Sequence, residues 1–313
     1  MGELRRGRRG VVLAAVAHAL AAALALGCGS SGGNGSTPLP PTTPTPPPIT
    51  PTTETLVGAG DIAMCNEPGA AQTARLLDSI PGTVVALGDL AYMQGSEQNF
   101  RECYDPTWGR PQIKNRTYPV PGNHEYEQPG AAAYFDYFGS RAGIPGRGYY
   151  SYHLAGWLVL ALDSNVAIGV GSPQYEWLRS ELQATPSTCA LAYAHHPLFS
   201  SGPNGGRARM RDVWDLLYQH GAEIYLTADD HLYDRQAPQD PSGRYDPTRG
   251  IREFVVGTGG ATLYQVVSPT ANSEVRHSGW GVLKLTLAQA SYSWEFVPVE
   301  GGSFRDAGTG NCH

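Results

Sequence analysis

The chain alternates short apolar runs with segments whose apolar residues recur at helical spacing. The short runs, rich in Val, Leu and Ala, predict strands at 55–60, 83–87, 157–162, 189–194, 223–227 and 252–256. Helical spacing predicts helices at 68–80, at about 172–183 with Ser172 as N-cap, and near 212–219. Two further runs between Trp280 and Pro298 predict a hairpin. Strands with intervening helices favour an α/β layered domain.

The first 28 residues have the pattern of an export signal. Arginines at positions 5, 6, 8 and 9 precede an apolar run of Ala and Leu at 11–27, which ends in small residues. The run is short for a membrane span, which needs roughly 20 residues. Ala25-Leu26-Gly27-Cys28 is similar to a bacterial lipoprotein cleavage site, so we predict that residues 1–28 are a lipoprotein signal and that Cys28 is lipidated. The alternative is an ordinary signal peptide on a secreted protein.

Residues 29–54 predict a linker rather than a folded segment. They are rich in Gly and Ser and then in Pro and Thr, a composition that cannot bury a core and favours extended polyproline II. The remaining residues, 55–313, suffice for one large domain. We therefore expect an exported protein, either a cell-envelope lipoprotein or secreted, that meets the membrane only through its lipid anchor.

Charge and cysteine content narrow the function classes. The whole chain carries −6, and removal of residues 1–28, with four Arg and one Glu, brings the charge to −9. A surface of this sign argues against nucleic-acid binding and suits small anionic substrates that approach a cationic centre. Four Cys remain after Cys28, and they allow three disulfide pairings. We favour Cys65–Cys103 with Cys189–Cys312; free buried thiols are the alternative.

Five short blocks carry the candidate chemistry: GDIA at 60–63, GDLAY at 88–92, GNHE at 122–125, AHHP at 194–197 and ADDH at 228–231. Most follow an apolar run directly, and sites in open α/β sheets form beyond the carboxyl ends of strands. The blocks supply oxygen and imidazole ligands for hard or borderline cations: Asp61, Asp89, Tyr92, Asn123, His195, Asp229 and His231. These are enough ligands for two metal ions, and an adjacent pair needs a shared anionic ligand, so one Asp must bridge.

The order and content of these blocks resemble the calcineurin-like metallophosphoesterases, and among them a bacterial, exported form of the purple acid phosphatase branch. The resemblance covers about 55–298. It implies an α/β fold of two packed mixed β-sheets flanked by helices. It also implies an acid phosphatase that hydrolyses phosphomonoesters, with a small phosphate ester as substrate, through a metal-activated hydroxide.

The same resemblance implies a role for each candidate residue. The ligands of the first metal are Asp61, Asp89, Tyr92 and His231, with Asp89 as the bridge, and Asn123 and His195 bind the second metal. Tyr92 follows Asp89 by three residues, as in the purple acid phosphatases, where the phenolate binds Fe(III). We therefore expect Fe at the first site and Zn, Mn or Fe at the second. His124 resembles the family's proton-donating histidine and is the candidate catalytic residue.

One block departs from the family pattern. The family has Gly-His-x-His where this chain has Ala228-Asp229-Asp230-His231, so Asp229 stands where a histidine ligand of the second metal is expected. Ionised Asp61, Asp89, Tyr92 and Asp229 carry −4, against −3 with a histidine. We expect this charge to weaken phosphate binding and to favour Mn or Mg over Zn at the second site. Asp229 binds the metal directly, binds it through water, or leaves the second site without metal.

The substrate side has fewer signals. A Gly-rich segment at 202–211 carries Arg207 and Arg209, which are candidate phosphate contacts, although a solvated loop is the simpler interpretation. Two alternatives to the phosphomonoesterase remain open. One is a phosphodiesterase or nucleotidase. The other is a catalytically weakened metal- or phosphate-binding surface protein, because Asp229 replaces the expected histidine.

Overall fold

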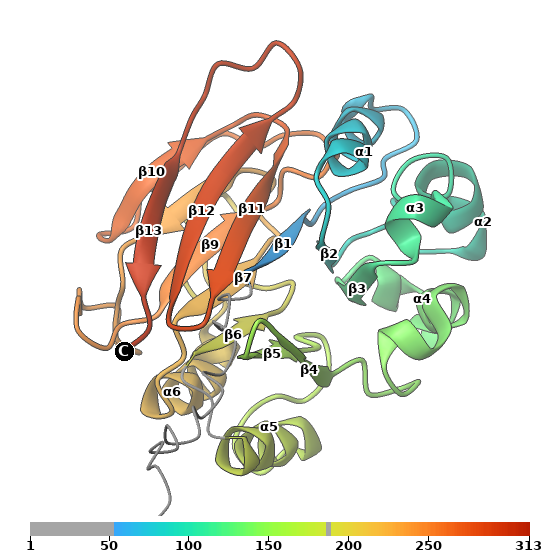
Figure 1. Cartoon of the computed structure of the whole chain (residues 1–313). Helices are drawn as coiled ribbons and strands as arrows, with labels where there is room; N and C mark the ends of the chain where they lie inside the picture. Colours follow the sequence, from blue (N-terminus) through green and yellow to red (C-terminus); the bar gives the residue numbers. More distant parts are fainter. Residues whose placement is uncertain (1–52, 186–188) are drawn as a thin grey trace, which may run out of the picture. The chain divides into compact units, whose positions relative to one another are not determined.

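Two mixed β-sheets form the centre of the structure, a computed structural model that describes residues 53–185 and 189–313 (Figure 1). The six-stranded sheet has the order β13-β12-β11-β1-β2-β3, with bounds Ala307–Asn311, Ser291–Pro298, Gly281–Ala288, Glu54–Ala59, Thr83–Leu87 and Thr117–Val120. The seven-stranded sheet has the order β10-β8-β9-β7-β6-β5-β4, with bounds Ser273–His277, Tyr233–Gln236, Arg252–Val256, Ile224–Thr227, Ala190–Tyr193, Trp157–Ala161 and Tyr150–Leu154. The predicted fold class, two packed mixed sheets flanked by helices, is confirmed.

Parallel pairing in both sheets brings strand ends together. β1, β2 and β3 are parallel neighbours in the first sheet. In the second sheet β5, β6, β7 and β9 are parallel. Antiparallel strands flank each parallel set, with β11 beside β1 and β4 beside β5. The loops that leave the parallel strands therefore start from one edge of each sheet, where side chains from distant segments can meet.

Alternating side chains on β5 show where the two cores lie. Trp157 and Val159 belong to the larger core, together with residues of β1, β9 and β11 such as Val57 and Leu285, so this core fills the space between the sheets. Leu158 and Leu160 belong to a second core with residues of the outer helices. Because successive strand residues point to opposite faces, an all-apolar strand such as β5 is buried on both sides.

Three longer helices flank the sheets: α1 at Gly69–Ser79, α5 at Pro173–Ala184 and α6 at Arg211–Gln219. All three agree with the predicted helices, and the Ser172 side chain caps α5 by accepting a hydrogen bond from the Tyr175 backbone N–H at 3.2 Å. In Figure 1, α5 and α6 lie on the second sheet and α1 to α4 lie beside the β1–β3 end of the first. The shorter helical elements are α2 Glu97–Asn99, a π-helix Phe100–Tyr104, α3 Pro111–Lys114, α4 Ala132–Phe138 and 3₁₀ turns at Glu125–Glu127, Pro129–Ala131, Gly139–Ala142 and Ala208–Met210.

Both favoured disulfides are present. Cys65 pairs with Cys103, with Cα atoms 4.7 Å apart, and joins the loop after β1 to the π-helix. Cys189 pairs with Cys312, with Cα atoms 5.5 Å apart, and joins the start of β6 to the end of β13. The second bridge closes a segment of 123 residues and so restrains the C-terminal strand against the body of the domain.

The predicted signal at 1–28, its Cys28, and almost all of the linker at 29–54 lie outside the described residues. Residue 54 is already the first residue of β1. Within the part of the chain that the structure describes, no helix is both long and apolar enough to cross a membrane.

Candidate metal centre

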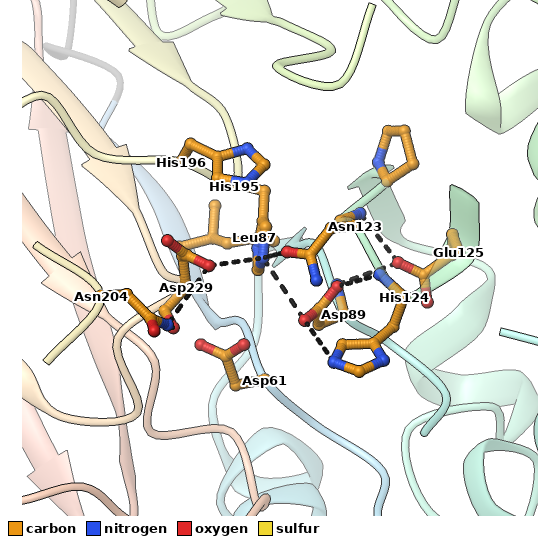
Figure 2. Close-up of polar contacts among 12 residues, drawn as sticks. Asp61, Leu87, Asp89, Asn123, His124, Glu125, His195, His196, Asn204 and Asp229 are labelled. Atoms are coloured by element: carbon orange, nitrogen blue, oxygen red, sulfur yellow. Dashed lines mark hydrogen bonds and ion pairs between the residues drawn. The ribbon is translucent and has the colours of Figure 1, made fainter. Parts of the chain in front are cut away.

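The candidate ligands follow the carboxyl ends of parallel strands. Asp61 and Asp89 each stand two residues beyond the last residue of β1 and β2, and Asn123 stands three beyond β3. In the second sheet, His195 and Asp229 stand two residues beyond β6 and β7. Figure 2 shows these side chains turned toward a common space. Loops from both sheets therefore contribute side chains to this common space, the pocket.

Tight turns at the strand ends present the carboxylates. Asp61, Asp89 and Asp229 have φ values of 55°, 51° and 68°. Asp is one of the few residue types other than Gly that enters this left-handed region readily. Gly122 packs directly against the Asp89 turn, and a Cβ at that position would lie 2.0 Å from Asp89 Oδ1. The close approach of the GNHE turn to the Asp89 turn therefore requires a glycine at this position.

A first group of donors surrounds the Tyr92 hydroxyl. Its oxygen lies 2.9 Å from Asp61 Oδ1, 3.2 Å from Asp89 Oδ2 and 3.0 Å from His231 Nε2. His231 Nε2 is also 3.4 Å from Asp61 Oδ1. These four residues are the set predicted for the first metal, and the structure brings all of them together.

A second group of donors surrounds His195. Its Nε2 lies 3.2 Å from Asn123 Oδ1, 3.4 Å from Asp89 Oδ2 and 3.8 Å from Asp229 Oδ1. These are the residues predicted for the second metal. Asp89 Oδ2 belongs to both groups, whereas Asp89 Oδ1 accepts a hydrogen bond from the His124 backbone N–H at 2.9 Å. A single carboxylate oxygen thus stands between the two donor groups.

Backbone carbonyls set the tautomers of both histidines. His195 Nδ1 lies 2.8 Å from the Leu87 carbonyl oxygen, and His231 Nδ1 lies 2.7 Å from the Thr262 carbonyl oxygen. A carbonyl only accepts hydrogen bonds, so each Nδ1 carries the proton and donates. In the neutral form of each ring, the Nε2 lone pair then faces the pocket, which is the arrangement typical of metal-ligating histidines.

The electrostatics of the pocket call for bound cations. Asp61 Oδ2 is buried and has no hydrogen-bond partner among the described residues. Burial, together with the nearby Asp89 and Asp229, raises the pKa of Asp61 to about 6 even though His231 and His195 oppose the shift. Burial also raises the pKa of Tyr92 well above its usual value. Asp61 and Tyr92 are therefore anionic together only beside a compensating positive charge, so the donor set fits hard cations.

Glu125 fixes the bridging turn from behind. It is fully buried, and its two carboxylate oxygens accept hydrogen bonds from the backbone N–H groups of Asp89, Leu90, Ala91 and Gly122 at 2.8–3.2 Å. Burial raises the pKa of Glu125 to about 7, and repulsion from Asp89 adds to the shift. This residue joins the β2 turn to the GNHE turn and positions Asp89. No role for Glu125 was predicted from the sequence, although the residue lies in the GNHE block among the candidate ligands.

Asp229 has a partner that the sequence did not predict. Its Oδ2 accepts hydrogen bonds from Nε and Nη2 of Arg207 at 3.2 and 3.0 Å. The predicted net charge of −4 counted only the anionic ligands. When the positive charge of Arg207 is included, the net charge of the site is −3. Arg207 was predicted to contact phosphate, and in this structure its guanidinium is instead paired with Asp229.

The other candidates border the pocket. His124 Nε2 lies 3.7 Å from Asp89 Oδ2, and its Nδ1 contacts the Met93 carbonyl and, at 3.2 Å, Glu127 Oε1. Arg209 Nη2 lies 3.1 Å from Nδ1 of His196, the residue that follows His195 of the second donor group.

Two further residues lie near the pocket: His196, which belongs to the AHHP block, and Tyr264, which had no signal in the sequence. His196 has a ring nitrogen within 4.8 Å of ligand atoms of His195 and Asp229, and its Nδ1 is also 2.7 Å from Ser164 Oγ. Tyr264 stacks on His231 with ring centroids 4.0 Å apart and an interplanar angle of 4°. Both are fixed by tertiary packing between loops far apart in the chain.

Sequence comparison agrees with the geometry. The sequence model of the family "calcineurin-like phosphoesterase" matches residues 55–233. Purple acid phosphatase 18 of Arabidopsis thaliana is 29% identical over 231 residues, covering 66% of this chain and 51% of the relative. The Fe(3+)-Zn(2+) purple acid phosphatase 12 of the same plant is 25% identical over 213 residues, covering 61% and 44%. The chain therefore spans about half the length of these curated relatives.

Structural comparison supports the same architecture. Purple acid phosphatase PPD1 from yellow lupin (Lupinus luteus) seeds superimposes with a TM-score of 0.72 at 19% identity. The match covers 83% of this chain and 54% of the lupin chain. At this identity the likeness shows the fold alone, namely two mixed sheets flanked by helices.

Proposed function

The chain belongs to the calcineurin-like phosphoesterase family, and we propose that it is an exported acid phosphatase that hydrolyses phosphomonoesters at a two-metal centre. Membership of the family and homology to purple acid phosphatases make the chain a metal-dependent phosphoric ester hydrolase. Beyond family membership, we propose that the chain binds two metals, acts on phosphomonoesters and acts outside the cytoplasm.

The observation that carries the proposal is the position of Asp89 Oδ2. It lies 3.2 Å from Tyr92 Oη and 3.4 Å from His195 Nε2, in the middle of two donor groups that otherwise share no atom. Two adjacent cations repel each other unless an anion stands between them. A carboxylate oxygen within reach of both donor groups supports a pair of ions that share it.

The chain's own residues supply orientation and proton transfer. When bound, a metal pair supplies charge stabilisation for the phosphoryl oxygens and lowers the pKa of water. Asp61, Tyr92 and His231 belong to the first donor group, and Asn123, His195 and Asp229 belong to the second. His124 stands at the rim beside Asp89, where its Nε2 is placed to give a proton to the leaving-group oxygen.

Iron is the metal that the first donor group favours. Burial and the carboxylates of Asp61 and Asp89 raise the pKa of Tyr92. Only a strongly charged cation therefore holds its side chain as phenolate. The Arabidopsis relative, an Fe(3+)-Zn(2+) purple acid phosphatase, supports Fe at the first site and Zn at the second. Mn and Fe remain alternatives at the second site.

The substrate and location follow from charge and from the N-terminal pattern. A pocket of this kind takes a small phosphate ester, and the net charge without residues 1–28, −9, disfavours long polyanions. The signal at 1–28, with Cys28 as anchor, supports action in the cell envelope or outside the cell.

A paired assay tests the proposed function. The chain from residue 29 onward is purified, its metals are measured by mass spectrometry, and it is assayed on p-nitrophenyl phosphate and on bis(p-nitrophenyl) phosphate. We expect two metals per chain and a preference for the monoester. Activity is lost on chelation and returns with Fe and Zn.

Other outcomes select the competing functions. Preference for the diester favours the phosphodiesterase. Two bound metals with no turnover on either ester favour a binding protein, which the departure at Asp229 makes worth testing. Fewer than two metals per chain rejects the proposed centre.

A further inference from the structure

The two carboxylate oxygens of Asp229 face different partners: one faces the pocket and the other faces the guanidinium of Arg207. Oδ1 lies 3.8 Å from His195 Nε2, on the side of the second donor group, and also accepts a hydrogen bond from Asn204 Nδ2 at 3.4 Å. Oδ2 faces away and accepts both hydrogen bonds from Arg207. The Asp229 side chain is only 5% exposed, whereas the Arg207 side chain is 40% exposed. A buried carboxylate therefore reaches the pocket with one oxygen while the other is held from the solvent side.

The segment that carries Arg207 is fastened to the Asp229 turn. The Asn204 side-chain amide donates to the Asp229 carbonyl oxygen at 2.6 Å. The next residue of the turn, Asp230, accepts hydrogen bonds from the backbone N–H groups of Asn204 at 2.8 Å and Gly205 at 3.1 Å. Arg207 itself donates its backbone N–H to the Pro197 carbonyl at 2.8 Å. These bonds fix where the Arg207 side chain starts, so its pairing with Asp229 is built into the loop.

This geometry accounts for the departure from the family pattern. A histidine at position 229 would contribute a neutral ligand, and the Asp229–Arg207 pair is also neutral overall. We propose that this pair replaces the imidazole: Asp229 Oδ1 is a ligand of the second metal, and Arg207 is a positioning residue that balances its charge and turns Oδ1 to the pocket. The inference rests on the proposed two-metal function.

The pair makes opposite predictions for two single substitutions. Arg207→Gln keeps an N–H donor for Oδ2 but removes the positive charge, so the ligand set becomes more negative. Second-metal affinity should rise about tenfold and phosphate affinity should fall, because a unit charge a few ångströms from a dication acts in these directions. Asp229→His leaves Arg207 as an uncompensated cation beside the site, so second-metal affinity should fall about tenfold.

The double variant is the decisive one. Asp229→His with Arg207→Gln restores the charge of the family pattern, so the second substitution should rescue the metal affinity that the first removes. Asp229 has a φ of 68°, and histidine is among the residues that tolerate this region, so the backbone does not oppose the change. A merely structural role for Arg207 would make the double variant the worst of the three.

The test uses the metal-free chain from residue 29 and Zn²⁺ with a competing chelator. Four proteins are titrated for the second equivalent of Zn²⁺: wild type, both single variants and the double variant. Phosphate affinity is measured on the Zn-loaded proteins by calorimetry, and thermal unfolding checks that each variant is folded. Arg211→Gln is the matched control, because it removes the same charge from an exposed residue that donates to the Pro241 carbonyl and not to Asp229. The control should stay within twofold of wild type.

The outcomes separate this inference from the proposed function. Tighter Zn²⁺ with weaker phosphate in Arg207→Gln, and rescue in the double variant, support the pair. Tighter Zn²⁺ in Asp229→His alone overturns it, because Arg207 would then be holding Asp229 off the metal. Equal shifts in Arg207→Gln and Arg211→Gln also overturn it, since charge alone would explain them. If the wild type binds fewer than two Zn²⁺, the two-metal function itself fails.

Discussion

The hydroxyl oxygen of Tyr92 lies 2.9 Å from Oδ1 of Asp61, inside a pocket where both side chains are buried. The phenol is also within hydrogen-bond distance of Asp89 and His231, so it stands at the centre of the first donor group. This placement favours a metal–phenolate bond over a filler role in the core. Removal of this hydroxyl oxygen therefore tests whether Tyr92 is a ligand of the first metal.

We predict that the iron-loaded protein absorbs visible light and that Tyr92→Phe abolishes the band. The substitution removes only the phenolate oxygen, so iron content should fall by less than half while the absorbance disappears. Tyr264→Phe is the control, because its ring stacks on His231 and none of the first-group distances involves its hydroxyl. An absorption band of unchanged intensity in Tyr92→Phe would show that the iron is bound elsewhere.

We predict that His124→Asn lowers kcat by roughly 10²- to 10³-fold on an alkyl phosphate, because general acid catalysis contributes on this scale. The loss should be much smaller on p-nitrophenyl phosphate, whose leaving group needs no proton. Rates on the two esters, each with metal content measured, give the comparison. Equal losses on both esters would reject a proton-donating role for His124.

We predict that Glu125→Gln lowers the free energy of unfolding by about 2 kcal/mol or more. Each carboxylate oxygen of Glu125 accepts two backbone N–H groups, and an amide nitrogen in place of one oxygen leaves two buried donors without partners. Denaturant unfolding of the metal-free protein measures the change. Glu97→Gln, at a side chain 91% exposed, should stay within about 0.5 kcal/mol of wild type. A similarly small change at Glu125 would contradict its positioning role.

A pH-dependent contribution comes from His313 at the end of β13. Its Nδ1 lies 2.5 Å from Glu223 Oε2, and this hydrogen bond raises the pKa of His313 above 6.5 although partial burial opposes the shift. A raised histidine pKa gives stability that is fully present below about pH 6.5 and is lost as pH rises through the folded-state value.

His313→Gln should therefore destabilise the protein by about 1 kcal/mol or less at a pH near 5.5, and by almost nothing near 8.5. Chemical unfolding of both proteins at the two pH values measures the difference. A gap that widens toward high pH would have the wrong sign for this ion pair.

The sequence predicted those parts of the fold that depend on local pattern. Apolar runs located β1, β2, β5, β6, β7 and β9, and capping by Ser172 located the start of α5. The strand β13 had no such signal, because its glycines pair with aromatic residues of β12. Gly308 is opposite Trp294 and Gly310 is opposite Tyr292, and both rings cover the glycines. Stability there comes from a partner strand, which composition does not reveal.

The candidate site divides in the same way. The sequence predicted the ligand types and their positions after strands, and the structure brings the seven predicted ligands together in one pocket. The pairing of Asp229 with Arg207 could not be predicted from the sequence. The two residues are 22 positions apart, and the chain between them forms α6 and β7 before it returns to the Arg207 loop. The predicted charge of the ligand set therefore did not include this neighbouring cation. Contacts between loops are set by the sheets that carry them, and no local spacing encodes them.

Anomalous X-ray diffraction from crystals of the metal-loaded protein tests the central claim most directly. We predict two anomalous peaks roughly 3.5–4 Å apart, with Asp89 Oδ2 in contact with both ions. A single peak, or a second ion that does not touch Asp89, would contradict the two-metal centre.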